Sequence, residues 1–257
     1  MSDNLARNGN AACIFDYVCD NDGAIIRKVI PHATLISFRV PDTLGGLPVK
    51  TLGDDLLSGV ESLTSIIIPD TVTTIEGGAF SKCVNLKSVK LPKGLKKIDD
   101  FTFADCTSLT DITLPSGIVA ISEYAFYKCS SLKAIIIPEG VTVIEDSAFS
   151  KCRSLQSVLI PPTVVSIGPS AFASCPLLSS IAIPDNVIAI GDKAFSNCKS
   201  LTAMTIPEGV TFIGNYVFSG CAALEKLEVP ERFQHLVDDL TIDFEMDEDT
   251  EMELDVD

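Results

Sequence analysis

The sequence predicts a right-handed solenoid made mainly of β-structure, in which short strands stack into a parallel sheet. Three observations lead to this prediction: an unbroken 23-residue period, apolar residues at the same places in every period, and strand-like alternation at each period's end. One period cannot bury its own apolar face, so neighbouring periods must stack on a common core. We expect the parallel sheet on the concave face and short strands and turns on the convex side.

Three residue types mark the period. Pro, Phe and Cys each recur every 23 residues, and seven consecutive units fill residues 69–229 without an insertion. Each unit follows the pattern P-x-x-V-x-x-I-x-x-x-A-F-x-x-C-x-x-L-x-x-I-x-I. We expect the recurring aromatic residues to be core rather than a recognition stripe. They are Phe80, Phe103, Phe126, Phe149, Phe172, Phe195 and Phe218.

The end of each unit predicts a strand. In the unit 138–160, Val158 and Ile160 are expected to point inward and Ser157 and Leu159 outward, because side chains alternate along a strand. The proline that opens the next unit ends the pairing, since it has no N–H to donate. Earlier in the unit, the V-x-x-I segment predicts a second short strand, and the helical spacing of A-F-x-x-C predicts a short turn.

Residues 1–40 are predicted to form an N-terminal tail and a β-hairpin cap, because a solenoid end exposes its core unless it is covered. The runs CIFDYVC and AIIRKVI are strand-like, and the Asp-Asn-Asp-Gly sequence at 20–23 between them is a strong hairpin signal. The solenoid follows over residues 41–236. It opens with a degenerate unit at 41–68 and ends with a partial unit at 230–236.

Residues 237–257 are predicted to form an acidic C-terminal cap or tail. Eleven acidic residues and no basic one lie from position 238 onward, so most of the net charge of −16 belongs to this segment. Apolar residues alternate with the acids there, which favours a capping hairpin. The same composition is also typical of a disordered tail, and a third interpretation is a segment that docks on a partner.

The repeat resembles a known family. The segments IPDTVTTIEGGAFSKCVNLKSVKL and IPEGVTVIEDSAFSKCRSLQSVLI are similar to the BspA-type leucine-rich repeat, over residues 41–236. Departures are small: Thr102 and Val217 replace the Ala before Phe, and Met204 replaces an inward Ile. The resemblance implies a leucine-rich-repeat solenoid of a kind found in surface or secreted proteins associated with adhesion and host-protein binding.

The sequence predicts neither an enzyme nor a cofactor or metal site. It contains no phosphate loop, no GxSxG and no C-x₂-C pair. The seven spaced cysteines occupy one slot of the repeat, which favours buried structural thiols. Disulfides between adjacent units and a metal site remain as weaker alternatives. The cysteines are Cys83, Cys106, Cys129, Cys152, Cys175, Cys198 and Cys221.

Charge and hydropathy limit the partners and the location. A net charge of −16 argues against nucleic acid and against anionic membranes, both of which need clustered Lys and Arg. The sequence contains no stretch of about 18 apolar residues, so it does not predict membrane insertion. The first twenty residues lack an export signal, which favours the cytoplasm. The family resemblance implies the cell surface or secretion instead, so both locations remain open.

The outward strand positions are the predicted protein-binding surface. They form two columns on the concave face, and the neighbouring Ile136 and Leu159 make an apolar patch within them. The alternative is that these two residues only reflect strand propensity. The first column is Ser65, Ser88, Asp111, Ala134, Ser157, Ser180 and Ala203. The second column is Ile67, Lys90, Thr113, Ile136, Leu159, Ala182 and Thr205.

The predicted function is therefore a protein-binding scaffold, for adhesion or for recognition of a host or partner protein whose identity the sequence does not give. An extended repeat surface favours this class. Two alternatives remain: a self-associating structural module, and a non-catalytic repeat domain of a larger effector. The adhesion assignment rests on analogy, because a repeat fold does not by itself define a function.

Overall fold

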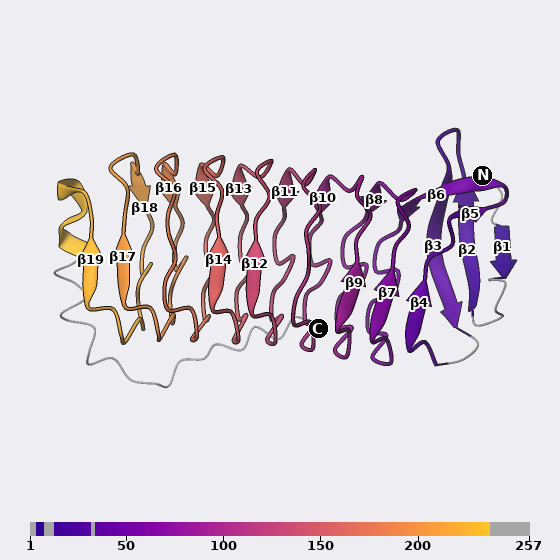
Figure 1. Cartoon of the computed structure of the whole chain (residues 1–257), viewed down its shortest axis with the longest axis horizontal. Helices are drawn as coiled ribbons and strands as arrows, with labels where there is room; N and C mark the ends of the chain where they lie inside the picture. The colour runs from indigo at the N-terminus through magenta and orange to yellow at the C-terminus, as the bar shows by residue number, and fades with distance from the viewer. Residues whose placement is uncertain (1–3, 8–12, 32–33, 237–257) are drawn as a thin grey trace.

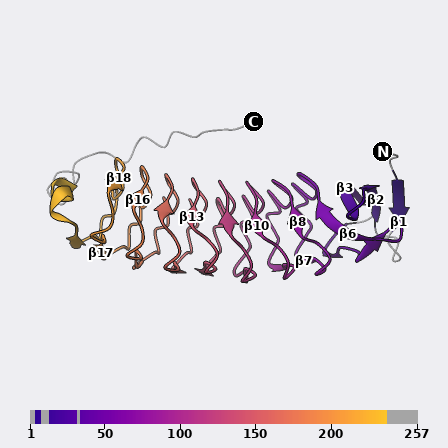
Figure 2. The ribbon, with the colours of Figure 1, turned by 90° about the horizontal axis from the view of Figure 1, so that it is seen from above.

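The computed structural model describes residues 4–7, 13–31 and 34–236, and shows a β-solenoid that carries a sheet at its N-terminal end (Figure 1). The units lie side by side along one axis, as the view from above shows (Figure 2). Almost no helix is present in the described ranges: the short 3₁₀ helix η1 (Glu231–Phe233) is followed by two helical residues at 235–236. The predicted solenoid of parallel strands is confirmed.

The N-terminal cap is built on the predicted hairpin. Its turn is closed by Asp20, whose Oδ1 accepts hydrogen bonds from the N–H groups of Asp22 and Gly23 at 2.8 and 3.0 Å. The sheet order is β1-β2-β3-β6-β5, and β6 also pairs in parallel with β8, the first short strand of the repeats. The cap strands are β1 (Asn4–Arg7), β2 (Cys13–Cys19), β3 (Ala24–Pro31), β5 (Thr43–Leu44) and β6 (Leu47–Leu52).

The cap passes into the solenoid through hydrogen bonds of the same kind as those between repeats. Strand β3 pairs in parallel with β6, and β6 with β8, so the hairpin continues the stack while covering its end. The hairpin buries Phe15 and Ile26 completely in the same core as the repeats. Strand β1, which the sequence did not predict, adds to the outer edge of β2. The proposed C-terminal hairpin lies outside the described residues.

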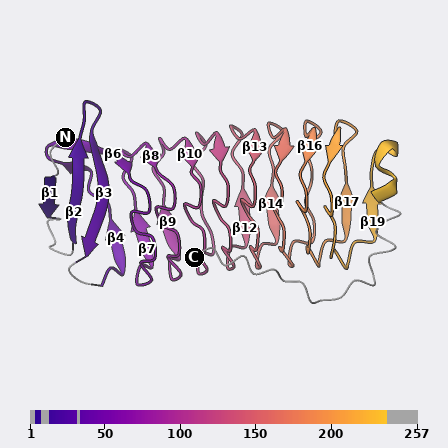
Figure 3. The same cartoon turned by 180° about the vertical axis from the view of Figure 1, so that it is seen from behind.

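The backbone of the regular units pairs with neighbouring units at the V-x-x-I segments and, in most units, also at the unit end. The V-x-x-I segments form the predicted second strands, and six of them make one continuous parallel sheet, here called the second sheet (Figure 3). Its last two strands, β16 and β18, align Ile190 with Ile213. The second-sheet strands are β10 (Lys97–Ile98), β11 (Ala120–Ile121), β13 (Val143–Ile144), β15 (Ser166–Ile167), β16 (Ala189–Ile190) and β18 (Phe212–Ile213); β8 is Thr74–Ile75.

The strands at the unit ends form three short sheets, and this corrects the prediction of one unbroken sheet. Residues 111–113 and 180–182 have the same sequence pattern as their neighbours but pair with neither. The stack survives these breaks, because the second sheet and the buried side chains hold the units together there. The strands are β4 (Ser37–Arg39), β7 (Ser65–Ile67), β9 (Ser88–Lys90), β12 (Ala134–Ile136), β14 (Ser157–Leu159), β17 (Ala203–Thr205) and β19 (Lys226–Glu228).

The Phe ladder forms the centre of the core, as the period predicts. Six of its seven side chains are fully buried, and Phe218 at the C-terminal end is 4% exposed. Neighbouring rings stack with centroids 5.3–6.2 Å apart and interplanar angles of 3–17°. Each of the five inner rings therefore fills the space between two others, which fixes the register of the units.

The A-F-x-x-C segment is a turn and not a turn of helix. Ser147 and Lys151 have φ values of 53° and 60°, and the equivalent residues of the other units are also left-handed. The N–H groups of Ser147, Phe149 and Lys151 donate to carbonyls of the next unit, whereas those between them bond within the unit. A helix would keep all these bonds internal. The solenoid instead directs alternate bonds to its neighbour.

Candidate protein-binding face

The two predicted columns lie together on one side of the solenoid, here called the strand face. Thirteen of the fourteen predicted residues are exposed, and Ser65 is half-buried. Strand pairing sets neighbours directly side by side, as with Ile136 and Leu159 in the parallel pair β12–β14. Four predicted residues lie in the unpaired segments, so no strand register aligns them with their neighbours: Asp111, Thr113, Ser180 and Ala182.

An apolar groove lies at the middle of the strand face. Ile136 and Leu159 are 67% and 61% exposed, which is unusually open for large aliphatic side chains. They line a groove of about 490 Å³ together with Ile112, Thr113 and Ala134. Its rim includes the prolines that open the following units. The groove is therefore shallow, mostly apolar and long enough to span three units.

The groove adjoins one of the breaks in the sheet. No backbone–backbone hydrogen bond is made by the described segment 111–114. Its peptide groups therefore lie beside Ile136 and its strand without the ladder partners that a continuous sheet would give them.

The middle of the strand face is uncharged. Between Thr113 and Thr205 the two columns contain only small, hydroxyl-bearing or aliphatic residues. Charge returns at the C-terminal end, where Lys226 and Glu228 form an ion pair at 2.9 Å. The bonds from Lys226 and from the Thr205 hydroxyl hold the pKa of Glu228 below its ordinary value. Recognition at the middle must therefore rely on shape and apolar contact.

Residues that were not predicted from the sequence extend the strand face at both ends. Strand β4 pairs in parallel with β7, so Ser37 and Arg39 continue the columns toward the cap. The sequence Ser-Phe-Arg-Val-Pro at 37–41 matches the end of a repeat, and this match could have revealed them. At the other end, Lys226 and Glu228 occupy the same positions in β19.

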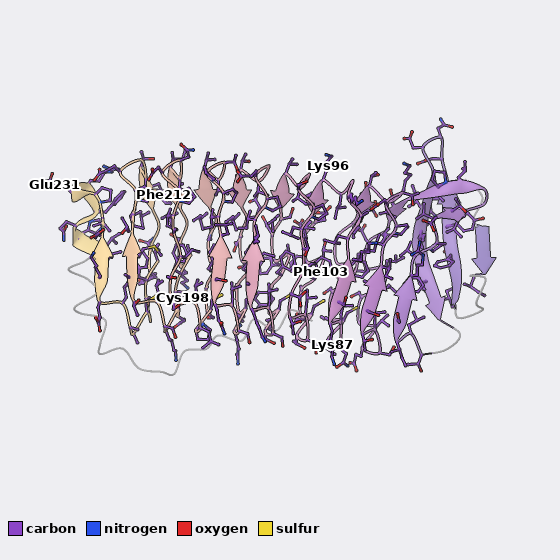
Figure 4. The ribbon with its side chains drawn as sticks, viewed as in Figure 1. Lys87, Lys96, Phe103, Cys198, Phe212 and Glu231 are labelled. Carbon is purple, nitrogen blue, oxygen red and sulfur yellow. The ribbon has the colours of Figure 1, made fainter. Side chains whose placement is uncertain are left out.

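A second group of exposed apolar residues lies on the second sheet. Val119, Val165, Ile188 and Phe212 are 52%, 37%, 51% and 55% exposed. Their exposure was not predicted, because the short V-x-x-I segment gives no firm direction for the side chains between its two inward residues. Phe212 is visible at the surface in Figure 4. These residues compete with the strand face as a contact surface.

The Cys ladder is a structural element of the core. Each thiol donates a hydrogen bond of 3.1–3.3 Å to a carbonyl of the preceding unit, for example from Cys152 Sγ to Phe126 O. All seven thiols are free and buried. Burial raises their pKa, to about 12 for Cys83 and about 11 for Cys221. A neutral thiol is a poor nucleophile and a poor metal ligand.

No group of three or more His, Cys, Asp or Glu side chains in residues 4–7, 13–31 and 34–236 is placed to hold a metal ion. Over the same residues, no helix has the length and apolar character needed to span a bilayer.

The repeats match a family model. The model for the BspA type leucine rich repeat region matches residues 50–178 and 165–240, in six copies. The chain belongs to the BspA-type leucine-rich repeat family. Leucine-rich repeats of this kind are generally protein-interaction scaffolds, which fits the extended strand face described above.

Solved structures show that this BspA-type chain shares its fold with several bacterial repeat proteins. A leucine-rich repeat protein from Bacteroides ovatus is 26% identical, with a TM-score of 0.72 over 85% of this chain and 70% of that one. The leucine rich repeat protein of T. pallidum is 29% identical, with a TM-score of 0.60 over 91% and 96%. A leucine rich cell surface protein from Faecalibacterium prausnitzii shares the fold at 23% identity, with a TM-score of 0.59 over 92% and 97%. No curated protein matches the chain.

Proposed function

We propose that this protein is an adhesion or recognition scaffold that binds a partner protein through the strand face. The observation that carries the proposal is the groove around Ile136 and Leu159, where two exposed aliphatic side chains lie beside unpaired backbone. Burying these two side chains against a partner would contribute roughly 1.5–3 kcal/mol each to the free energy of binding. The partner is expected to offer an extended apolar segment. Such a segment could fill the groove and pack against both side chains.

We further propose that the protein acts at the cell surface or after secretion, as the family resemblance implies. The alternative location is the cytoplasm. Fractionation of the native cells, with an antibody against the strand face applied to intact cells, separates the two locations. Labelling of intact cells supports the surface location, and labelling only after lysis contradicts it.

Binding to a panel of purified matrix proteins tests the strand face. The test variant is Ile136→Asp with Leu159→Asp, which places two charges in the groove. The matched control is Ile188→Asp with Phe212→Asp, which makes the same change on the second sheet. Circular dichroism first shows that both are folded. A matrix protein retained by the wild type and the control, but at least tenfold weaker on the test variant, supports the proposal.

The opposite pattern would place recognition on the second sheet and overturn the assignment to the strand face. Absence of any bound matrix protein would argue against adhesion.

Self-association is the second candidate function, because the apolar residues around Ile188 and Phe212 are themselves exposed. Sedimentation velocity over a wide concentration range tests it. A mass that rises with concentration, and falls back in the Ile188→Asp, Phe212→Asp variant, would favour the self-associating module.

A further inference from the structure

Basic residues gather along one edge of the solenoid, here called the basic edge. They lie in the turn that runs from the residue before the ladder Cys to the residue before the unit-end strand, and all are exposed or half-buried. Figure 4 shows Lys87 on this edge and Lys96 on the opposite one. The seven residues of the basic edge are Lys82, Lys87, Lys128, Lys133, Lys151, Arg153 and Lys199.

Acidic residues are scarce on the basic edge and concentrated elsewhere on the same units. Over the seven units, only Asp105 and Glu225 are acidic at the equivalent turn positions. The two positions that follow the second-sheet strand show the reverse pattern, with seven acids and no base across the seven units. These acids are Glu76, Asp99, Asp100, Glu123, Glu145, Asp146 and Asp192. The repeat thus separates charge across its section, although its net charge is negative.

Most of the basic edge lacks partners within the described part of the chain. Lys128 forms an ion pair with Asp105 at 3.7 Å, and no carboxylate lies within 4.0 Å of the other six cations. At its centre, the Lys128 and Lys151 ammonium groups lie 5.3 and 5.6 Å from the ring centroid of the half-buried Tyr127. The edge therefore offers unpaired positive charge beside an aromatic surface.

The chain itself carries a segment of complementary chemistry. Residues 238–257 contain eleven acids and no base, with apolar side chains such as Phe244 and Met246 between them. Twenty extended residues span up to about 70 Å. The seven units between Pro230 and the unit of Lys82 span only about 35 Å, at a strand-like spacing of about 4.8 Å per unit. Every cation of the basic edge is within reach.

We propose that the basic edge is an interaction surface for an acidic polypeptide segment, and that residues 238–257 of the same chain occupy it. The carboxylates pair with the edge cations, and the apolar side chains pack near Tyr127. This contact covers the cationic side of the solenoid and leaves the strand face free. The inference is independent of the proposed partner-binding groove, because the two surfaces share no residue.

Zero-length cross-linking of the full chain with a carbodiimide tests the proposal, because it joins amines only to carboxylates in direct contact. Mass spectrometry then identifies the lysines joined to residues 238–257. We expect links to Lys133, Lys151 and Lys199 in the monomer at low concentration, and few to Lys93 or Lys96. The links should fall at least tenfold between about 0.01 M and about 1 M salt, as the screening length shortens from about 30 to about 3 Å.

A matched pair of variants gives the control. Lys133→Glu with Lys199→Glu reverses charge on the basic edge and should reduce the links to Lys151 at least tenfold. Lys93→Glu with Lys96→Glu makes the same change in net charge on the opposite edge and should leave the links to Lys151 unchanged. Links spread equally over both edges would overturn the proposal. So would links found only between copies, in a dimer band that grows with concentration, since the occupant would then be a second molecule.

Discussion

The Phe ladder concentrates core packing in one side chain per unit. Phe149 is fully buried, and its ring lies between those of Phe126 and Phe172 at 5.3 and 5.4 Å with interplanar angles of 3°. Phe149→Ala should lower the free energy of unfolding by about 3–5 kcal/mol, because neighbouring units cannot close the cavity without losing register. Denaturant titration measures this value.

An exposed Phe provides the comparison. Phe101 is 45% exposed and stacks on Tyr124 at 4.8 Å outside the core. Phe101→Ala should cost no more than about 1.5 kcal/mol, the typical worth of an aromatic pair beyond its burial. Equal losses for Phe101→Ala and Phe149→Ala would contradict the central role of the ladder.

The buried thiols predict a loss of stability at alkaline pH. Burial raises the pKa of Cys83 from 9.0 to about 12, so the unfolded chain ionises there first. Stability from this group is therefore complete below pH 9 and is lost as the pH rises toward 12. Denaturant midpoints measured between pH 8 and 11 should fall. In the Cys83→Ala variant, the free energy of unfolding should fall less steeply with pH, by up to about 1.4 kcal/mol per pH unit. If the variant and the wild type have the same slope, this thiol ionises as readily in the folded protein as in the unfolded chain.

At the scale of the strand, the two sides of the solenoid differ in continuity. The second sheet runs unbroken from β10 to β18, whereas the strand face is interrupted at 111–113 and 180–182. Amide protons of the interrupted segments should exchange at least tenfold faster than those of β12 and β14, because no backbone acceptor holds them. Hydrogen exchange followed by mass spectrometry or NMR measures this. Uniform protection along the strand face would mean that the ladder is continuous in solution.

The repeat pattern predicts which residues are buried more reliably than which strands pair. Each core position occurs seven times, so a single exception cannot obscure the pattern. Pairing depends on the separation of neighbouring backbones, which the sequence does not encode locally. The interrupted Asp111-Ile112-Thr113 has the same alternation as the paired Ser88-Val89-Lys90. The groove beside residues 111–114 could not have been predicted for the same reason, although its exposed residues Ile136 and Leu159 could.

The ends of the molecule were harder to predict than its middle. Strand β1 is only four residues long, NLAR, and has no apolar alternation. It forms because β2 offers an open edge, which is a tertiary cause. Strand β4 has the repeat pattern but precedes the degenerate unit, and the longer loop of that unit hides the period. The repeat thus determines the fold where neighbours are alike, and the caps depend on contacts that occur once.

At the scale of the whole molecule, stacking of like units makes the length of the solenoid adjustable. Deleting residues 138–160 joins Ile137 to Pro161, which restores the pattern at the junction and places Phe126 beside Phe172. The shortened chain should fold, because each unit contacts only its neighbours. Its denaturant m-value should fall by about a tenth, in proportion to the surface removed. Deleting 138–159 removes one residue fewer and shifts every inward position at the junction, so it should unfold at a much lower denaturant concentration. Equal stability of the two deletions would mean that the 23-residue register does not hold the stack together.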